Sequence, residues 1–190
     1  TVFVCVDIIS NHADLEDLDA RIEMYGERAI GLKVYFDSEI SDVQDISPLQ
    51  EICEYARKRN FKVMVHCSNS PTPMKEIVCT LSKGDILTHA YHGGINSCAE
   101  ENFEVFRIAK ERGIIIDTGF AGHVHTNFQN FKNAIKAGYL PNTISTDITK
   151  YSLFKRGGRY GMTMCMSMAR EAGMCEDDIL KAVTSIPAKV

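Results

Sequence analysis

Four side chains that are far apart in the sequence could share one chemistry: Lys33, His66, His89 and Asp147. A lysine inside an apolar run is costly unless its ammonium reaches solvent, a partner or a modified form. Taken alone, Lys33 is most simply explained by an amine that reaches an edge of the fold. His66 and His89 end equivalent apolar runs. Since neighbouring strands lie about 4.8 Å apart, their imidazoles can converge on one ion. Imidazoles combined with a carboxylate suit zinc, manganese or iron.

The remaining candidates carry weaker signals. Asp147 is either the cap of a following helix or a metal-binding carboxylate that also moves protons. His92 follows His89 by three residues, where it could support a ligand or face substrate. We interpret His123-Val124-His125 as a loop near the mouth of the site that contacts substrate, in preference to a metal-binding pair. His12 has no supporting context and indicates a surface loop.

Short apolar runs rich in β-branched residues alternate with amphipathic segments along the chain. Leu49, Ile52, Cys53 and Ala56, for example, have the spacing of one helix face. Near-continuous apolar runs favour a sheet that is covered on both faces, and the alternation is typical of a parallel α/β fold. The predicted strands are Val2–Asp7, Ile30–Phe36, Lys62–His66, Asp85–His89, Gly113–Asp117 and Thr143–Ile148.

We take a polar residue as the end of each predicted strand, at intervals of 23 to 33 residues; these residues are Asp7, Lys33, His66, His89, Asp117 and Asp147. A (β/α)8 barrel uses about 30 residues per unit and takes its catalytic groups from the carboxyl ends of its strands. The spacing therefore predicts an incomplete (β/α)8 TIM barrel with about six of its eight units, formed by residues 1–190 as one domain. The abrupt ends of the chain suggest a fragment that lacks the first strands. The alternative is a complete, open, doubly wound sheet of six strands.

Composition narrows the functional classes. Lys and Arg number 21 against 25 Asp and Glu, for a net charge of −4, which argues against nucleic-acid and membrane partners. No apolar stretch is long enough for a membrane span, and no signal peptide is recognisable. Seven cysteines without a Cys-x-x-Cys pair indicate buried thiols in a reducing compartment. We expect a cytoplasmic protein with a small-molecule substrate, and we leave open whether it forms a homo-oligomer.

These motifs resemble the amidohydrolase superfamily, in particular the dihydroorotase-like metal-dependent hydrolases of the deacetylase and adenine deaminase-like group. The resemblance covers nearly the whole chain, and it is the order and spacing of the motifs that make it specific. The tail Ala182–Lys189 resembles the family's Thr-x-Asn-Pro-Ala-Lys stretch, with Ile186 in place of the usual Asn. The motifs are Gly31-Leu32-Lys33, Val65-His66, Leu87-Thr88-His89, Gly113-Ile114-Ile115-Ile116-Asp117 and Ser145-Thr146-Asp147-Ile148.

The resemblance implies a role for each matching position. Lys33 corresponds to a lysine that is carboxylated and bridges two divalent metal ions, with zinc as the first expectation. His66 and His89 correspond to ligands of the second metal, and Asp147 to a ligand of the first metal and the proton shuttle. The chain would hold strands 3 to 8 of the family barrel, and the family's first-strand His-x-His would precede Thr1.

The activity implied by the resemblance is hydrolysis of an amide, cyclic amide, N-acyl or ester bond by a metal-bound hydroxide. Two alternatives stay open at this point. Lys33 could form a Schiff base, as in class I aldolase-like barrels, although this leaves the two histidines and Asp147 without a shared task. The chain could also be an inactive fragment.

Overall fold

The central element is a five-stranded parallel sheet in a computed structural model that describes residues 1–100, 102–121, 125–150 and 161–190. The strands are β1 (Val2–Val6), β4 (Ala29–Tyr35), β5 (Lys62–His66), β6 (Ile86–Thr88) and β7 (Ile115–Ile116), and their order in the sheet follows the sequence. In a doubly wound sheet the strand order reverses, whereas around a barrel wall each strand pairs with the next one. The observed order confirms the barrel-type prediction.

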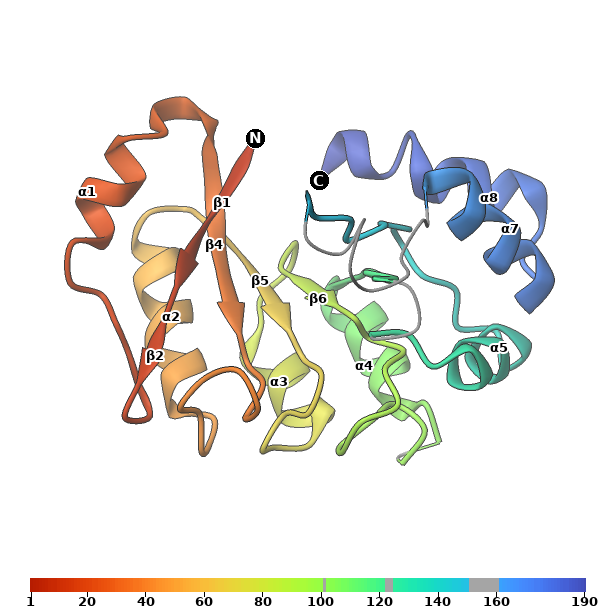
Figure 1. Ribbon diagram of the computed structural model, residues 1–190, viewed down its shortest axis with the longest axis horizontal. Coiled ribbons are helices and arrows are strands. Elements are labelled where there is room, and N and C mark those ends of the chain that lie inside the picture. Colours follow the sequence, from red (N-terminus) through yellow and green to blue (C-terminus); the bar gives the residue numbers. More distant parts are fainter. Residues whose placement is uncertain (101, 122–124, 151–160) are drawn as a thin grey trace.

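Helices follow the strands as the sequence predicts (Figure 1). They are α1 (Leu18–Glu23), α2 (Ser47–Lys58), α3 (Met74–Thr80), α4 (Glu104–Arg112), α5 (Phe128–Lys136), α7 (Met162–Ala172) and α8 (Glu176–Val183). A small antiparallel hairpin of β2 (Ile8–Ile9) and β3 (His12–Ala13) precedes α1, and short 3-10 turns occupy Gly26–Arg28 and Pro187–Lys189. Among the described helices, none combines the length and apolarity that crossing a bilayer requires. All seven cysteines are described, and each is a free thiol.

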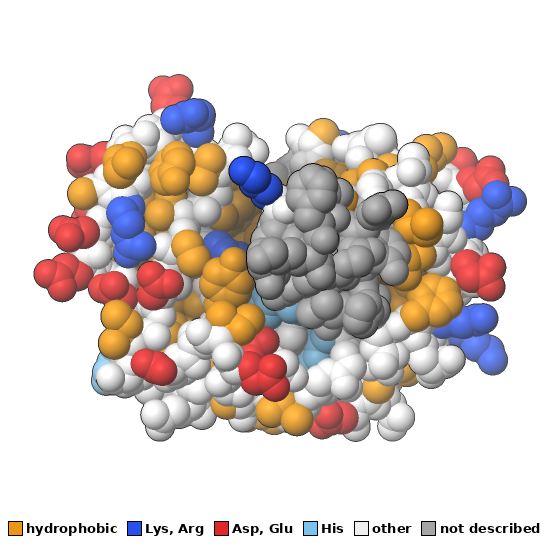
Figure 2. Space-filling model, in the orientation of Figure 1, with side chains coloured by type: hydrophobic (Ala, Val, Ile, Leu, Met, Phe, Trp, Pro, Cys, Tyr) orange, Lys and Arg blue, Asp and Glu red, His pale blue; other side chains and the backbone are white. Residues whose placement is uncertain are grey.

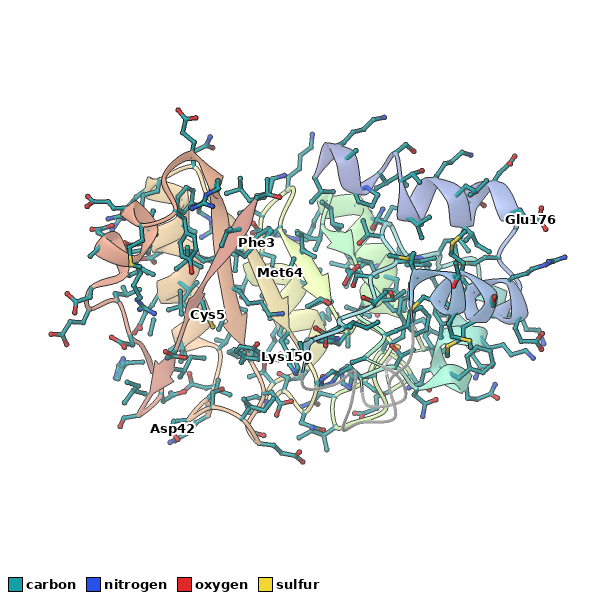
Figure 3. The ribbon with its side chains drawn as sticks, turned by 45° about the horizontal axis from the view of Figure 1, so that its top comes forward. Phe3, Cys5, Asp42, Met64, Lys150 and Glu176 are labelled. Carbon is teal, nitrogen blue, oxygen red and sulfur yellow. The ribbon has the colours of Figure 1, made fainter. Side chains whose placement is uncertain are left out.

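The two faces of the sheet have different environments. One face carries Leu32, Val34, Val63 and Val65, which are fully or almost fully buried, and α2 packs on β4 and β5. The opposite face carries half-buried side chains such as Phe3 and Met64, which are labelled in Figure 3. This face lines an open cavity of about 530 Å³. The described part of the chain thus has α2 on one face of the sheet, whereas the other face lines this cavity together with Met162 of α7 and Val183 of α8.

The prediction of a last strand at Thr143–Ile148 is wrong, because this segment does not form a regular strand. It makes one isolated parallel bridge, between Asp117 and Thr143. The amide of Ser145 donates to the Thr118 hydroxyl at 3.1 Å, where a regular ladder would use a backbone carbonyl. The segment nonetheless runs beside the end of β7, since the Thr118 amide donates to the Thr143 carbonyl at 3.2 Å. The Thr118 side chain thus takes the place of one backbone acceptor in the expected hydrogen-bond ladder.

One buried carboxylate connects three of these segments. Asp117, 6% exposed, accepts hydrogen bonds from the hydroxyls of Thr88, Thr143 and Ser145, each at 2.7 Å. Hydrogen bonds to an ionised acceptor are stronger than those between neutral groups. Asp117 therefore holds the end of β6, the end of β7 and the segment that leads to Asp147 in one arrangement.

We predict that replacing Asp117 with Ala lowers the free energy of unfolding by about 3 kcal/mol, because three buried hydroxyls lose their acceptor. Thr143→Val, which removes one hydroxyl at nearly constant shape, should cost about 1 to 2 kcal/mol. Urea unfolding followed by circular dichroism measures both changes. The control is Glu54→Ala on the exposed face of α2, which should stay within about 0.5 kcal/mol. An Asp117→Ala effect as small as the control would contradict the connecting role.

Candidate active site

A cavity of about 540 Å³ opens at the carboxyl ends of β4, β5 and β6, and all four residues singled out from the sequence line it. Figure 2 shows histidine surface within the recess at the centre of this face, next to acidic side chains. The cavity shares Lys33, His89 and Asp147 with the apolar cavity over the open face of the sheet. The carboxyl edge is where barrel enzymes build their sites.

Three imidazoles converge in this cavity. One nitrogen of each of His66, His89 and His125 lies within 4.8 Å of the others. The ring centroids are 4.4 Å apart for His66 and His89, 4.8 Å for His66 and His125, and 4.3 Å for His89 and His125. Among the described histidines, cysteines and acidic residues, this is the group whose donor atoms are close enough for a metal ion. Imidazole nitrogens are common zinc ligands, so the donor set fits a divalent transition metal.

His66 is held by two polar neighbours. Its Nε2 lies 3.2 Å from Asp37 Oδ2 and 3.0 Å from the Ser68 hydroxyl oxygen. Asp37 and His66 are each only 2% exposed. Burial lowers the pKa of His66, and the hydrogen bond to Asp37 opposes that shift. A histidine that donates one ring nitrogen to a carboxylate offers the other as a ligand, an arrangement that recurs around metal sites.

The orientation of His89 is fixed by the backbone. His89 directly follows β6 with φ 63°, and its Nδ1 lies 2.8 Å from the Gly119 carbonyl oxygen. Because a carbonyl can only accept, Nδ1 carries the proton and Nε2 keeps the lone pair. Burial, with further contributions from His66, Lys33 and His125, holds the pKa of His89 well below its ordinary value. The ring is therefore neutral at pH 7, which is the form that binds metal.

Lys33 lies within β4, two residues before its end, so its predicted position at a strand end is wrong. Its side chain still reaches the carboxyl-edge cavity. Nζ lies 5.5 Å from the centroid of the Tyr35 ring. Burial lowers the pKa of Lys33 to about 8, although the charges of Asp147 and Asp117 oppose the shift. A sizeable fraction of the amine is thus neutral near physiological pH, and only the neutral amine is nucleophilic.

Asp147 lies at the rim of the cavity. It is exposed, has φ 49° and lines the cavity together with Lys33, His66 and His89. The three-histidine group that could hold one ion does not include it. The structure therefore brings all four predicted residues to one cavity, but it places only His66 and His89 in the compact group.

His125 lines the cavity, in agreement with its predicted place near the mouth, but it also joins the two predicted ligands. It was interpreted as part of a substrate loop, yet its Nδ1 lies 3.2 Å from the Ser68 hydroxyl and its ring stands against His66 and His89. The signal was the His-x-His spacing, which places alternate side chains on one face. Its neighbour His123 lies outside the described residues. His12 is exposed as predicted and pairs with Glu51 at 3.0 Å.

The sequence and the fold are similar to those of named enzymes over about half of those proteins' length. The chain is 29% identical over 180 residues to a deacetylase of Brucella anthropi, covering 92% of this chain and 44% of that protein. It is 28% identical over 188 residues to a deacetylase of Enterococcus faecalis, covering 93% of this chain and 50% of that protein. The chain therefore spans about half the length of the curated relatives it matches. No family model matches the sequence.

Solved structures agree with the sequence matches. A dihydroorotase superposes with a TM-score of 0.82 at 28% identity, covering 93% of this chain and 46% of that one. An adenine deaminase superposes with a TM-score of 0.79 at 24% identity, covering 90% and 47%. The fold is thus a partial TIM barrel. The resemblance to dihydroorotase-like members of the amidohydrolase superfamily is confirmed.

The buried imidazoles predict an acid-sensitive fold. The pKa values of His66 and His89 are lowered in the folded chain, so below about pH 6.5 the unfolded chain binds more protons than the folded one. The free energy of unfolding should then fall as the pH drops from 7 to 5, by up to about 1.4 kcal/mol per pH unit for each group. Urea titrations of the metal-free protein at several pH values measure this slope. His89→Gln should reduce it, and an unchanged slope would contradict the argument.

We predict that His125→Ala weakens zinc binding at least tenfold, because one of three converging nitrogens is removed. Isothermal titration calorimetry with zinc alone measures the dissociation constant. The matched control is His12→Ala, an exposed histidine on the β2–β3 hairpin, which should bind zinc as the wild type does. Equal affinities for His125→Ala and wild type would remove His125 from the metal site.

Proposed function

We propose that this chain carries part of the active site of a metal-dependent hydrolase that cleaves an amide, cyclic amide, N-acyl or ester bond of a small molecule. The observation that carries the proposal is the convergence of three imidazoles, Lys33 and Asp147 on one cavity at the carboxyl edge of a parallel sheet. The named relatives support it, because deacetylases, a dihydroorotase and an adenine deaminase all match this chain. The free thiols are consistent with a cytoplasmic location.

His66, His89 and His125 would hold a divalent metal, for which we propose zinc. A bound metal supplies Lewis-acid activation of water and of the substrate carbonyl. The chain contributes the fixed orientation of its ligands. Asp37 and Ser68 hold His66, and the Gly119 carbonyl holds His89. Such preorganisation means that little has to rearrange when substrate binds.

Lys33 is the candidate for a modified ligand. An ammonium cannot bind a cation, whereas a neutral amine can add carbon dioxide and release a proton to water to become an anionic carbamate. The pKa of about 8 makes neutral amine available near physiological pH. We propose that carboxylated Lys33 helps to hold a second zinc ion, together with Asp147, which lines the same cavity.

Asp147 is suited to move protons. Its carboxylate lies at the exposed rim, where substrate and water can reach it. We propose that it accepts a proton from the attacking water and then gives that proton to the leaving amine. Positioned general bases of this kind contribute about 10² to 10⁴ in rate.

The second candidate function is a Schiff-base enzyme. It is favoured by one observation, the lowered pKa of Lys33 in a partly buried position. Borohydride reduction in the presence of pyruvate would trap a carbonyl substrate on Lys33 in that enzyme. Loss of activity on treatment with a chelator would favour the hydrolase.

Two variants test the proposed roles on a panel of N-acetyl amino acids, cyclic ureides and acyl esters. Asp147→Asn should keep at least the zinc proposed at the three histidines but lower kcat by a factor of about 10² or more, since the proton acceptor is lost. Lys33→Ala should lose the second zinc ion and the activity together, and bicarbonate should not restore them. Metal content by atomic absorption and steady-state kinetics provide the readouts.

The matched control is Asp17→Asn. Asp17 is also an exposed aspartate with a left-handed backbone, at φ 53°, and it caps α1 without a side-chain hydrogen bond. Its kcat should equal that of the wild type. A near-normal rate in Asp147→Asn would remove the proton-shuttle role, and full activity in Lys33→Ala would remove the lysine from the mechanism.

A further inference from the structure

His92 is a buried histidine that lies outside the three-histidine group. It lines the same cavity and is only 1% exposed. Among the described residues, its Nε2 is a buried side-chain atom that has no hydrogen-bond partner. An unpaired buried polar group costs about 1 to 3 kcal/mol, and native proteins satisfy nearly all of them. The unpaired nitrogen therefore indicates a partner that is not part of the described chain.

The hydrogen bond at the other ring nitrogen fixes what that partner must be. The Gly94 backbone amide donates to Nδ1 of His92 at 3.2 Å. A backbone amide can only donate, so Nδ1 holds a lone pair and the ring is neutral. The single ring proton must then be on Nε2. His92 consequently presents an N–H donor, and its partner must be an acceptor.

The main chain that carries His92 is held in place by hydrogen bonds and close packing. The His92 amide donates to the His89 carbonyl at 3.1 Å, and the His92 carbonyl accepts from Asn130 Nδ2 at 2.9 Å. The turn is packed so closely that a side chain at Gly94 would collide with the side chain of Asn69. These contacts fix the main chain at His92, and the Gly94 amide contacts the ring itself at Nδ1.

We propose that His92 is a substrate-binding residue whose Nε2–H donates to an oxygen of the substrate, either the acyl carbonyl or a carboxylate. The inference rests on the proposed hydrolase function and adds a recognition contact to it. It assigns His92 to the side of the cavity that orients the substrate, separate from the residues proposed to hold metal. A neutral donor of this kind prefers oxygen acceptors and gives no attraction to a substrate amine that is protonated.

The test is binding of two probes to the zinc-loaded protein. N-acetylglycine offers both an acyl carbonyl and a carboxylate, and N-acetylglycinamide offers carbonyls without the carboxylate. Long-range proton–nitrogen NMR spectra of the histidine rings, assigned with His92→Gln, report the tautomer and any shift at Nε2. We expect His92 to show a protonated Nε2 and an unprotonated Nδ1, and Nε2 to shift when a probe binds.

Two variants measure the contact. His92→Phe keeps the volume but removes the donor, and it should weaken probe binding about tenfold. His92→Gln places an amide donor near the position of Nε2 and should stay within about threefold of the wild type. Weakening for N-acetylglycine alone identifies the carboxylate as the acceptor. Weakening for both probes identifies a carbonyl oxygen as the acceptor.

Several results would overturn the proposal: a proton on Nδ1 in the wild-type spectrum, no binding of either probe to the wild type, or equal affinities for wild type and His92→Phe. The tautomer measurement needs no variant, so it remains decisive if His92→Phe does not fold. Failure of the hydrolase function has a different signature, since the probes would bind through His92 while no member of the substrate panel is hydrolysed. Conversely, if His92→Phe hydrolyses substrate with an unchanged kcat/KM, only the substrate-binding role of His92 is ruled out, and the hydrolase function stands.

Discussion

The site depends on the parallel pairing of β4, β5 and β6 in one register. Tyr35 pairs with His66, and His66 pairs with Thr88, so the strands end together at one edge. His89 then leaves β6 at the level where β5 ends. A shift of one residue in either pairing would turn the polar side chains toward the helices and the apolar ones toward the cavity. Register thus decides that imidazoles, and not valines, meet at this edge.

Burial keeps the imidazoles of His66 and His89 neutral by lowering their pKa values. Removal from water disfavours the charged forms of His66 and His89, and the neighbouring rings and Lys33 add to the effect at His89. Neutral rings placed so close together have little mutual repulsion, but each needs a defined tautomer. The Gly119 carbonyl and Asp37 supply that definition for His89 and His66. The arrangement combines three converging imidazoles with a lysine whose own charge is weakened.

Most of the architecture could be predicted from the sequence, because it depends on local patterns. Lys62–His66 was predicted as a strand with its observed bounds, and the strand order followed from the alternation of strands and helices. Thr143–Ile148 was not predictable in the same way. It has the composition of a strand, but the hydroxyl of Thr118 takes the place of a backbone acceptor, and composition does not reveal such a substitution.

The site was predictable where a residue lies on or directly after a strand. His66 and His89 are of this kind, and the sheet fixes their positions. His125 belongs to a loop, and its position against the other rings depends on contacts between distant segments, such as that of Ser68 with His125. Asp37 was missed for a similar reason, since an aspartate just past a strand resembles an ordinary turn residue until its partner is known.

The left-handed backbone at His89 and Asp147 limits which amino acids can stand at these two positions. Apart from glycine, mainly asparagine, aspartate and histidine adopt such angles without a large penalty. Both positions therefore face two independent demands, one from the functional group and one from the main chain. A β-branched replacement would fail on conformational grounds even if the chemistry were supplied elsewhere. Sequence variation at these positions is consequently a poor guide to catalytic importance, because the fold alone would restrict it.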